Sequence, residues 1–126
     1  MLVDDSADDN FFHTREMNKT NLVENVISKC TGIEALMYLK SEKASQDLHP
    51  ELIFLDLNMP GMNGWEFLEE YTKLDKNLQS HAVIIMHATS ENSNEAIKAR
   101  AFNFVADFIP KPLTKDVLKD IDKYLK

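Results

Sequence analysis

The stretch FLDLNMPGMNGW, residues 54–65, ends an apolar run on a carboxylate, Asp56, and continues at once into turn residues. A short run of apolar residues bounded by turn signals is typical of a strand buried on both faces of a sheet. The Pro60-Gly61 pair predicts a tight turn, and Asn63 with Glu66 three residues later has the pattern of a capping box. The stretch therefore predicts a buried strand that ends at Asp56 and returns through a turn into a helix.

The same unit recurs along the chain. Short apolar runs predict strands at residues 1–3, about 22–27, 52–57, 82–88 and 104–109. Capping patterns at Thr31 and Asn92 predict two more helix starts. An apolar stripe predicts an amphipathic last helix with Leu113, Val117, Leu118, Ile121, Tyr124 and Leu125 on one face. Five strand-helix units predict an α/β fold, an open parallel sheet with helices on both faces.

Composition limits the class of protein. A chain of 126 residues, 44% hydrophobic and 28% charged, is long enough for one core, so we expect a single domain over residues 1–126. The net charge of -7 argues against a nucleic-acid-binding face. One cysteine, Cys30, cannot form an internal disulfide. The acidic amino terminus and the shortness of the apolar runs predict no signal peptide and no membrane span, and hence a cytoplasmic protein.

Polar residues follow the predicted strands at one edge of the sheet. Asp4 and Asp5 follow the first strand, Asp56 ends the third, Thr89 follows the fourth and Lys111 follows the fifth. In open parallel sheets, functional sites lie beyond the carboxyl ends of the strands. Three carboxylates repel one another unless a cation lies among them, and their hard oxygen ligands suit Mg²⁺. A carboxylate can also attack a phosphoryl group, whose negative charge Mg²⁺, Lys111 and Thr89 could neutralise.

These residues resemble the signature of a known family. The segments Val3-Asp4-Asp5, Leu55-Asp56-Leu57-Asn58-Met59-Pro60 with Gly64, Ala88-Thr89-Ser90 and Lys111-Pro112 are similar to those of the receiver domain of two-component response regulators, the family of the bacterial chemotaxis regulator. The resemblance covers essentially the whole chain. It implies a flavodoxin-like sheet with strand order 2-1-3-4-5, and a cis peptide bond between Lys111 and Pro112.

The resemblance also implies roles in phosphoryl transfer. Asp56 would accept a phosphoryl group from a sensor histidine kinase or a histidine phosphotransfer protein. Asp4, Asp5, Asp56 and the backbone carbonyl of Asn58 would hold Mg²⁺, and Lys111 would contact the phosphoryl group. Such a chain is a signalling phospho-acceptor rather than an enzyme, although it assists its own phosphorylation and dephosphorylation.

Two further sets of residues would regulate the signal. By resemblance, Asn58 and Glu91 flank the path of the water that hydrolyses the phosphoryl group. Thr89 would contact the phosphoryl group and move toward it, and Phe108 would fill the space that Thr89 leaves. The face formed by the fourth helix, fifth strand and fifth helix would then change shape and bind a downstream protein or a second copy of the chain.

Other interpretations compete with this one. A phosphatase of the haloacid-dehalogenase type also uses an aspartyl nucleophile with Mg²⁺, but it needs a second acid where this chain has Asn58. A nucleotide-binding module would need a glycine-rich loop after the first strand, which is missing. A pseudo-receiver would signal without phosphorylation, whereas every chemical residue is present here. Of the adjacent Phe11 and Phe12, one could contact the kinase, or one could be buried and the other incidental.

Overall fold

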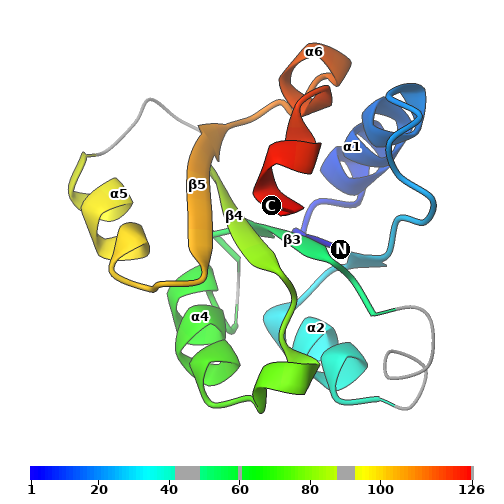
Figure 1. Cartoon of the computed structure of the whole chain (residues 1–126). Coiled ribbons are helices and arrows are strands. Elements are labelled where there is room, and N and C mark those ends of the chain that lie inside the picture. The colour runs from blue at the N-terminus through cyan, green and yellow to red at the C-terminus, as the bar shows by residue number, and fades with distance from the viewer. Residues whose placement is uncertain (42–48, 60, 88–92, 126) are drawn as a thin grey trace.

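The computed structural model describes residues 1–41, 49–59, 61–87 and 93–125. Figure 1 shows a central sheet with helices packed on both sides. In chain order the elements are β1 Leu2–Val3, α1 Ala7–Lys19, β2 Ser28–Lys29, α2 Gly32–Leu39, β3 Leu52–Asp56, α4 Gly64–Thr72, the 3₁₀ helix η1 Lys76–Leu78, β4 Ala82–His87, α5 Ser93–Arg100, β5 Val105–Pro110, α6 Lys115–Leu118 and the 3₁₀ helix η2 Ile121–Leu125.

The sheet has five parallel strands in the order β2-β1-β3-β4-β5. The α/β class and the flavodoxin-like strand order expected from the sequence are therefore confirmed. The order reverses between β1 and β3, since the chain first moves outward to β2 and then returns past β1. A reversal of this kind leaves a crevice at the carboxyl ends of the two strands, where ligands of such sheets bind.

Alternate residues of the central strand β3 point to opposite sides of the sheet, as pleating requires. Ile53 and Leu55 pack with the side chains of α2, α4 and α5. Leu52 and Phe54 pack on the other face with α1, α6 and η2. All five residues of β3 are buried, which explains why its sequence is continuously apolar up to Asp56.

The helix starts follow the predicted capping residues. The Thr31 hydroxyl accepts a hydrogen bond from the Glu34 N–H at the start of α2. At the start of α4, the Asn63 side chain accepts from the Glu66 N–H at 3.0 Å, and the Glu66 carboxylate accepts from the Asn63 N–H at 3.1 Å. This complete capping box fixes the point at which the chain turns back from β3. The predicted cap Asn92 lies outside the described residues.

The predicted second strand at residues 22–27 is wrong. β2 is Ser28–Lys29, and Leu2 of β1 lies opposite Ser28. Val23 and Val26 are partly buried against the core instead. These residues are therefore apolar because they pack against the core, and not because they pair in the sheet.

The last helix also differs from its prediction. It is divided into α6 and η2, and three residues of its predicted stripe are buried: Leu113, Leu118 and Ile121. Val117 and Leu125 are exposed, at 48% and 38%. A 3₁₀ helix repeats every three residues, so η2 does not keep Leu125 on the side of Ile121 as an α-helix would. Within the described residues, no helix has both the length and the apolar character that crossing a membrane requires.

Candidate functional site

Asp56 closes β3 at the carboxyl edge of the sheet, and only 4% of the residue is exposed. The chain leaves β3, turns, and starts α4 directly against the end of the strand. The Gly64 N–H donates a hydrogen bond to the Leu57 carbonyl at 2.9 Å. A Cβ at Gly64 would lie 2.5 Å from Leu57 Cα and 2.9 Å from the Asp56 carbonyl oxygen. Only glycine fits here, so the sequence Asn63-Gly64 brings the helix start against the backbone of Asp56.

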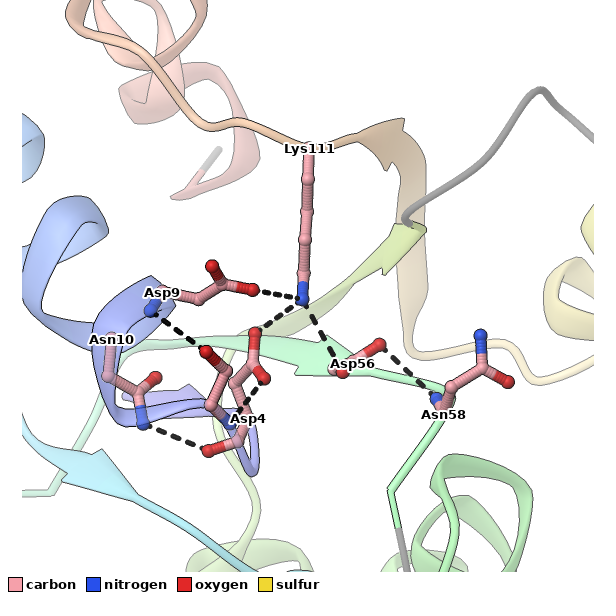
Figure 2. Close-up of polar contacts among 7 residues, drawn as sticks. Asp4, Asp9, Asn10, Asp56, Asn58 and Lys111 are labelled. Carbon is pink, nitrogen blue, oxygen red and sulfur yellow. Dashed lines mark hydrogen bonds and ion pairs between the residues drawn. The ribbon is translucent and has the colours of Figure 1, made fainter.

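Lys111 follows β5, and its ammonium group lies among three carboxylates (Figure 2). Its Nζ is 2.6 Å from Asp4 Oδ2, 3.0 Å from Asp9 Oδ2 and 3.4 Å from Asp56 Oδ2. Only 13% of the Lys111 side chain is exposed. The Lys111–Pro112 peptide bond is cis, as the resemblance to receiver domains implied. One cation therefore connects the ends of β1, β3 and β5.

The charges of the site shift the proton equilibria of Asp56 and Lys111. Burial raises the pKa of the Asp56 carboxyl, and the Asp4 charge raises it further. Two interactions lower the pKa of Asp56: the hydrogen bond that the Asn58 N–H donates to Asp56 Oδ1 at 3.2 Å, and the charge of the Lys111 ammonium. They offset only part of the increase, so the pKa of Asp56 stays above its ordinary value. Burial lowers the pKa of Lys111, but its bonds to Asp4 and Asp9 and the nearby carboxylate charges raise it above its ordinary value. Lys111 is therefore a permanent cation in this site.

Asp4, Asp5 and Asp56 form a group of carboxylates that could hold a metal ion. Each offers one oxygen, and these oxygens all lie within 4.8 Å of one another. Asp5 is exposed, whereas Asp4 and Asp56 are buried, so the group is open to solvent on one side. An all-oxygen donor set with room for water fits Mg²⁺ better than a softer metal.

The start of α1 holds Asp4 in place. Asp4 Oδ1 accepts a hydrogen bond from the Ser6 N–H at 3.0 Å, and the Asp4 carbonyl accepts one from Asn10 Nδ2 at 2.9 Å. Ser6 caps the helix, since its hydroxyl accepts from the Asp9 N–H at 3.1 Å. The two bonds at Asp4, one to its side chain and one to its backbone, direct the carboxylate toward Lys111.

Comparison with known proteins agrees with this geometry. Residues 1–122 match the model of the response regulator receiver domain family. The chain belongs to this family. A solved two-component response regulator from Cytophaga hutchinsonii is 29% identical, with a TM-score of 0.85, over 98% of this chain and 93% of that chain. The phosphorylated cyanobacterial phytochrome response regulator RcpA is 26% identical, with a TM-score of 0.71, over 98% of this chain and 89% of that chain.

A curated relative is longer than this receiver domain. The protein-glutamate methylesterase/protein-glutamine glutaminase 2 of Burkholderia thailandensis is 30% identical over 101 residues, which are 77% of this chain and 27% of that protein. Across the matched methylesterases this share of the relative runs from 24% to 32%. The receiver domain thus spans about a quarter to a third of these proteins.

Some of the residues predicted for the site lie together in the structure, and others lie apart or outside the described residues. The structure brings together Asp4, Asp56 and Lys111, with Asp5 beside them. Asn58 is exposed, and its side-chain amide points away from the Asp56 carboxylate (Figure 2). The predicted residues Thr89 and Glu91 lie outside the described residues.

Phe108, the predicted switch residue of the receiver, is buried, with 7% of the residue exposed. Its ring stacks on His87 at the end of β4, with ring centroids 4.6 Å apart and an angle of 14° between the planes. The ring thus already occupies an inward position in this structure.

Two sequence interpretations need revision around α1. Phe11 and Phe12 are both exposed, at 66% and 39%, so the alternative in which one of them is buried is wrong. Asp9 was missed as a site residue. The pattern Ser6-Ala-Asp-Asp9 signals a helix start, but nothing local indicates that the Asp9 carboxylate reaches a lysine 102 positions later.

A cavity of about 330 Å³ lies away from the carboxylates, near the amino-terminal ends of the strands. Its lining includes Leu22, Val26, Leu52 and Leu125, and none of the site residues. The cavity therefore lies at the opposite edge of the sheet from the candidate site.

Proposed function

We propose that Asp56 is the phospho-acceptor of this receiver domain. The observation that carries the proposal is the placement of Asp56: a buried carboxylate at the end of β3, 3.4 Å from a lysine ammonium and grouped with two other acids. Burial and the bond from the Asn58 N–H hold the carboxylate in one orientation. A fixed nucleophile beside a fixed cation is the arrangement that phosphoryl transfer needs.

The proposed donor is a phosphohistidine of a sensor histidine kinase or of a histidine phosphotransfer protein. One Asp56 carboxylate oxygen forms a bond to phosphorus while the bond between phosphorus and the histidine nitrogen breaks. The Lys111 ammonium stabilises the charge on the phosphoryl oxygens as they approach Asp56. Asp4, Asp5, Asp56 and the Asn58 carbonyl would hold Mg²⁺, which would supply further positive charge to those oxygens.

The proposed output is a change on the face formed by α5, β5, α6 and η2. Thr89 would move toward the phosphoryl group and alter the start of α5. Because Phe108 is already inward, phosphorylation would keep its ring there rather than draw it in. This face would bind a downstream protein or a second copy of the chain.

We also propose that residues 1–126 form one receiver domain, located in the cytoplasm, that signals by binding rather than by catalysis. The family match over residues 1–122 supports the assignment of these residues to a receiver domain. Asn58 and Glu91 would tune the lifetime of the phosphoryl group.

Intact mass spectrometry tests the proposal directly. Incubation with acetyl phosphate and Mg²⁺ should add one phosphate-sized mass to the wild-type chain, and hydroxylamine should remove it, since acyl phosphates react with hydroxylamine. Asp56→Asn should gain no such mass. A wild-type gain in Asp56→Asn would show that another carboxylate is the nucleophile.

A further inference from the structure

Asp9 departs from the role that its position in α1 suggests. It is the third residue after the cap Ser6, where an acid normally completes a capping box by accepting from the N–H of the cap residue. Here the Ser6 N–H donates to Asp4 Oδ1 instead, at 3.0 Å. The Asp9 carboxylate is thus not used by the cap. It turns across the site toward Lys111 (Figure 2), and Asp9 Oδ2 lies 3.0 Å from Lys111 Nζ.

Asp9 also differs from the other carboxylates around Lys111. Asp4 and Asp56 belong to the group whose oxygens could hold one metal ion, and Asp9 does not. When a cation draws Asp4 and Asp56 to itself, their attraction for the Lys111 ammonium weakens. Asp9 is then the partner that still holds the ammonium in place, because its carboxylate has no part in the metal site.

A phosphoryl group on Asp56 would need the same ammonium. Lys111 Nζ is 3.4 Å from Asp56 Oδ2, closer to Asp9 at 3.0 Å, and its side chain is largely buried. The ammonium has three N–H donors, and the carboxylates of Asp4, Asp9 and Asp56 already lie within 3.4 Å of it. Any oxygen bound to Asp56 must compete with Asp9 for it.

We propose that Asp9 is a positioning residue that restrains Lys111 and so lowers the affinity of the site for a phosphoryl group on Asp56. This inference rests on the proposed function of Asp56. Asp9 then sets the threshold for activation: it stabilises the unphosphorylated site and opposes the phosphorylated one. The Asp9 side chain is 44% exposed, and a half-exposed ion pair is worth a factor of about two to five in an equilibrium constant.

The test uses beryllium fluoride as a mimic of the phosphoryl group. Its affinity is measured at saturating Mg²⁺ in wild type, Asp9→Asn, Asp9→Glu and Asp8→Asn. Asp8 is a matched control because it also lies in the first turn of α1 and is exposed. Asp8→Asn removes one negative charge and one favourable interaction with the helix dipole, as Asp9→Asn does.

Asp9→Asn should bind beryllium fluoride about two- to fivefold more tightly than wild type, since the competing carboxylate is gone. Asp9→Glu, which keeps the carboxylate, should bind with the wild-type affinity, and Asp8→Asn should change the affinity little. The difference between wild type and Asp9→Asn should shrink as salt is added, because the competition is electrostatic. A purely structural role for Asp9 in α1 would instead weaken binding in Asp9→Asn.

Three results would overturn the inference. Equal affinities in wild type and Asp9→Asn would show that Asp9 does not compete. If Asp9→Asn and Asp8→Asn both bind beryllium fluoride more tightly by the same factor, the loss of one negative charge explains the change, and the contact between Asp9 and Lys111 does not. Weaker binding in Asp9→Asn would mean that Asp9 supports the site, by its place in α1 or by holding Lys111 where the phosphoryl group needs it, and does not oppose phosphorylation. In each case wild type still binds the mimic, so the role of Asp56 stands; a wild type that neither binds it nor gains phosphate removes both proposals.

Discussion

Because Gly64 lies in close contact with the end of β3, we expect the substitution Gly64→Ala to lower both the stability of the chain and its rate of phosphorylation. The added Cβ would lie 2.5 Å from Leu57 Cα and 2.9 Å from the Asp56 carbonyl oxygen. Carbon atoms in contact are normally about 3.5 to 4.0 Å apart, so α4 and the end of β3 must separate by roughly 1 Å. Both atoms belong to the backbone and cannot rotate away as a side-chain tip could.

We expect two separate consequences. Overpacking of this kind costs about 1 to 3 kcal/mol of stability, part of which is the weakened bond from the Gly64 N–H to the Leu57 carbonyl. The same separation moves Asp56 relative to Lys111, and a displacement of about 1 Å at a reacting group can lower a rate by about a hundredfold. Urea unfolding measures the first effect, and the rate of mass gain with acetyl phosphate and Mg²⁺ measures the second.

Gly61→Ala is the matched control. Gly61 has a φ of +73°, but a Cβ there would meet no atom within 4 Å. The alanine should therefore cost about 1 kcal/mol through backbone strain without moving Asp56, and phosphorylation should stay near the wild-type rate. If Gly64→Ala is phosphorylated as fast as Gly61→Ala, the close approach of α4 does not position the acceptor, and the reasoning fails.

The charges of the site lead to two further predictions. Because the pKa of Asp56 is raised in the folded chain, its ionised form opposes folding above that pKa. The metal-free wild type should therefore gain stability relative to Asp56→Asn as the pH falls from neutral toward the ordinary pKa of an aspartate; urea unfolding at several pH values checks this, and a parallel pH dependence in the two proteins contradicts it. Mg²⁺ should stabilise wild type by about 2.7 kcal/mol at a hundredfold excess over its Kd, and Asp5→Ala should lose most of this gain while Asp8→Ala keeps it. Equal thermal melting of wild type with and without saturating Mg²⁺ would count against a metal site.

The sequence pattern predicted structure best where residues close together in the chain determine the backbone conformation. The apolar run before Asp56, the turn after it and the capping box at Asn63 lie within one short segment, so local rules decide their structure. The cis bond at Lys111–Pro112 and the strand order followed from the resemblance to receiver domains, and both are confirmed. The second strand failed because the hydrophobicity of residues 22–27 indicates burial, and burial does not require pairing in a sheet.

The sequence alone determined that an acid closes a buried strand, that acids and a lysine follow other strands, and that parallel strands bring these residues to one edge. Only the tertiary structure decided how the charges pair. Lys111 lies 2.6 Å from Asp4 and 3.0 Å from Asp9 because the end of β5 and the start of α1 meet at the same edge of the sheet. Asp9 is free for this pairing because Asp4 takes the N–H of Ser6. Ion pairs between residues far apart in the chain depend on side-chain directions and on competing hydrogen bonds, and these exist only once the elements are packed.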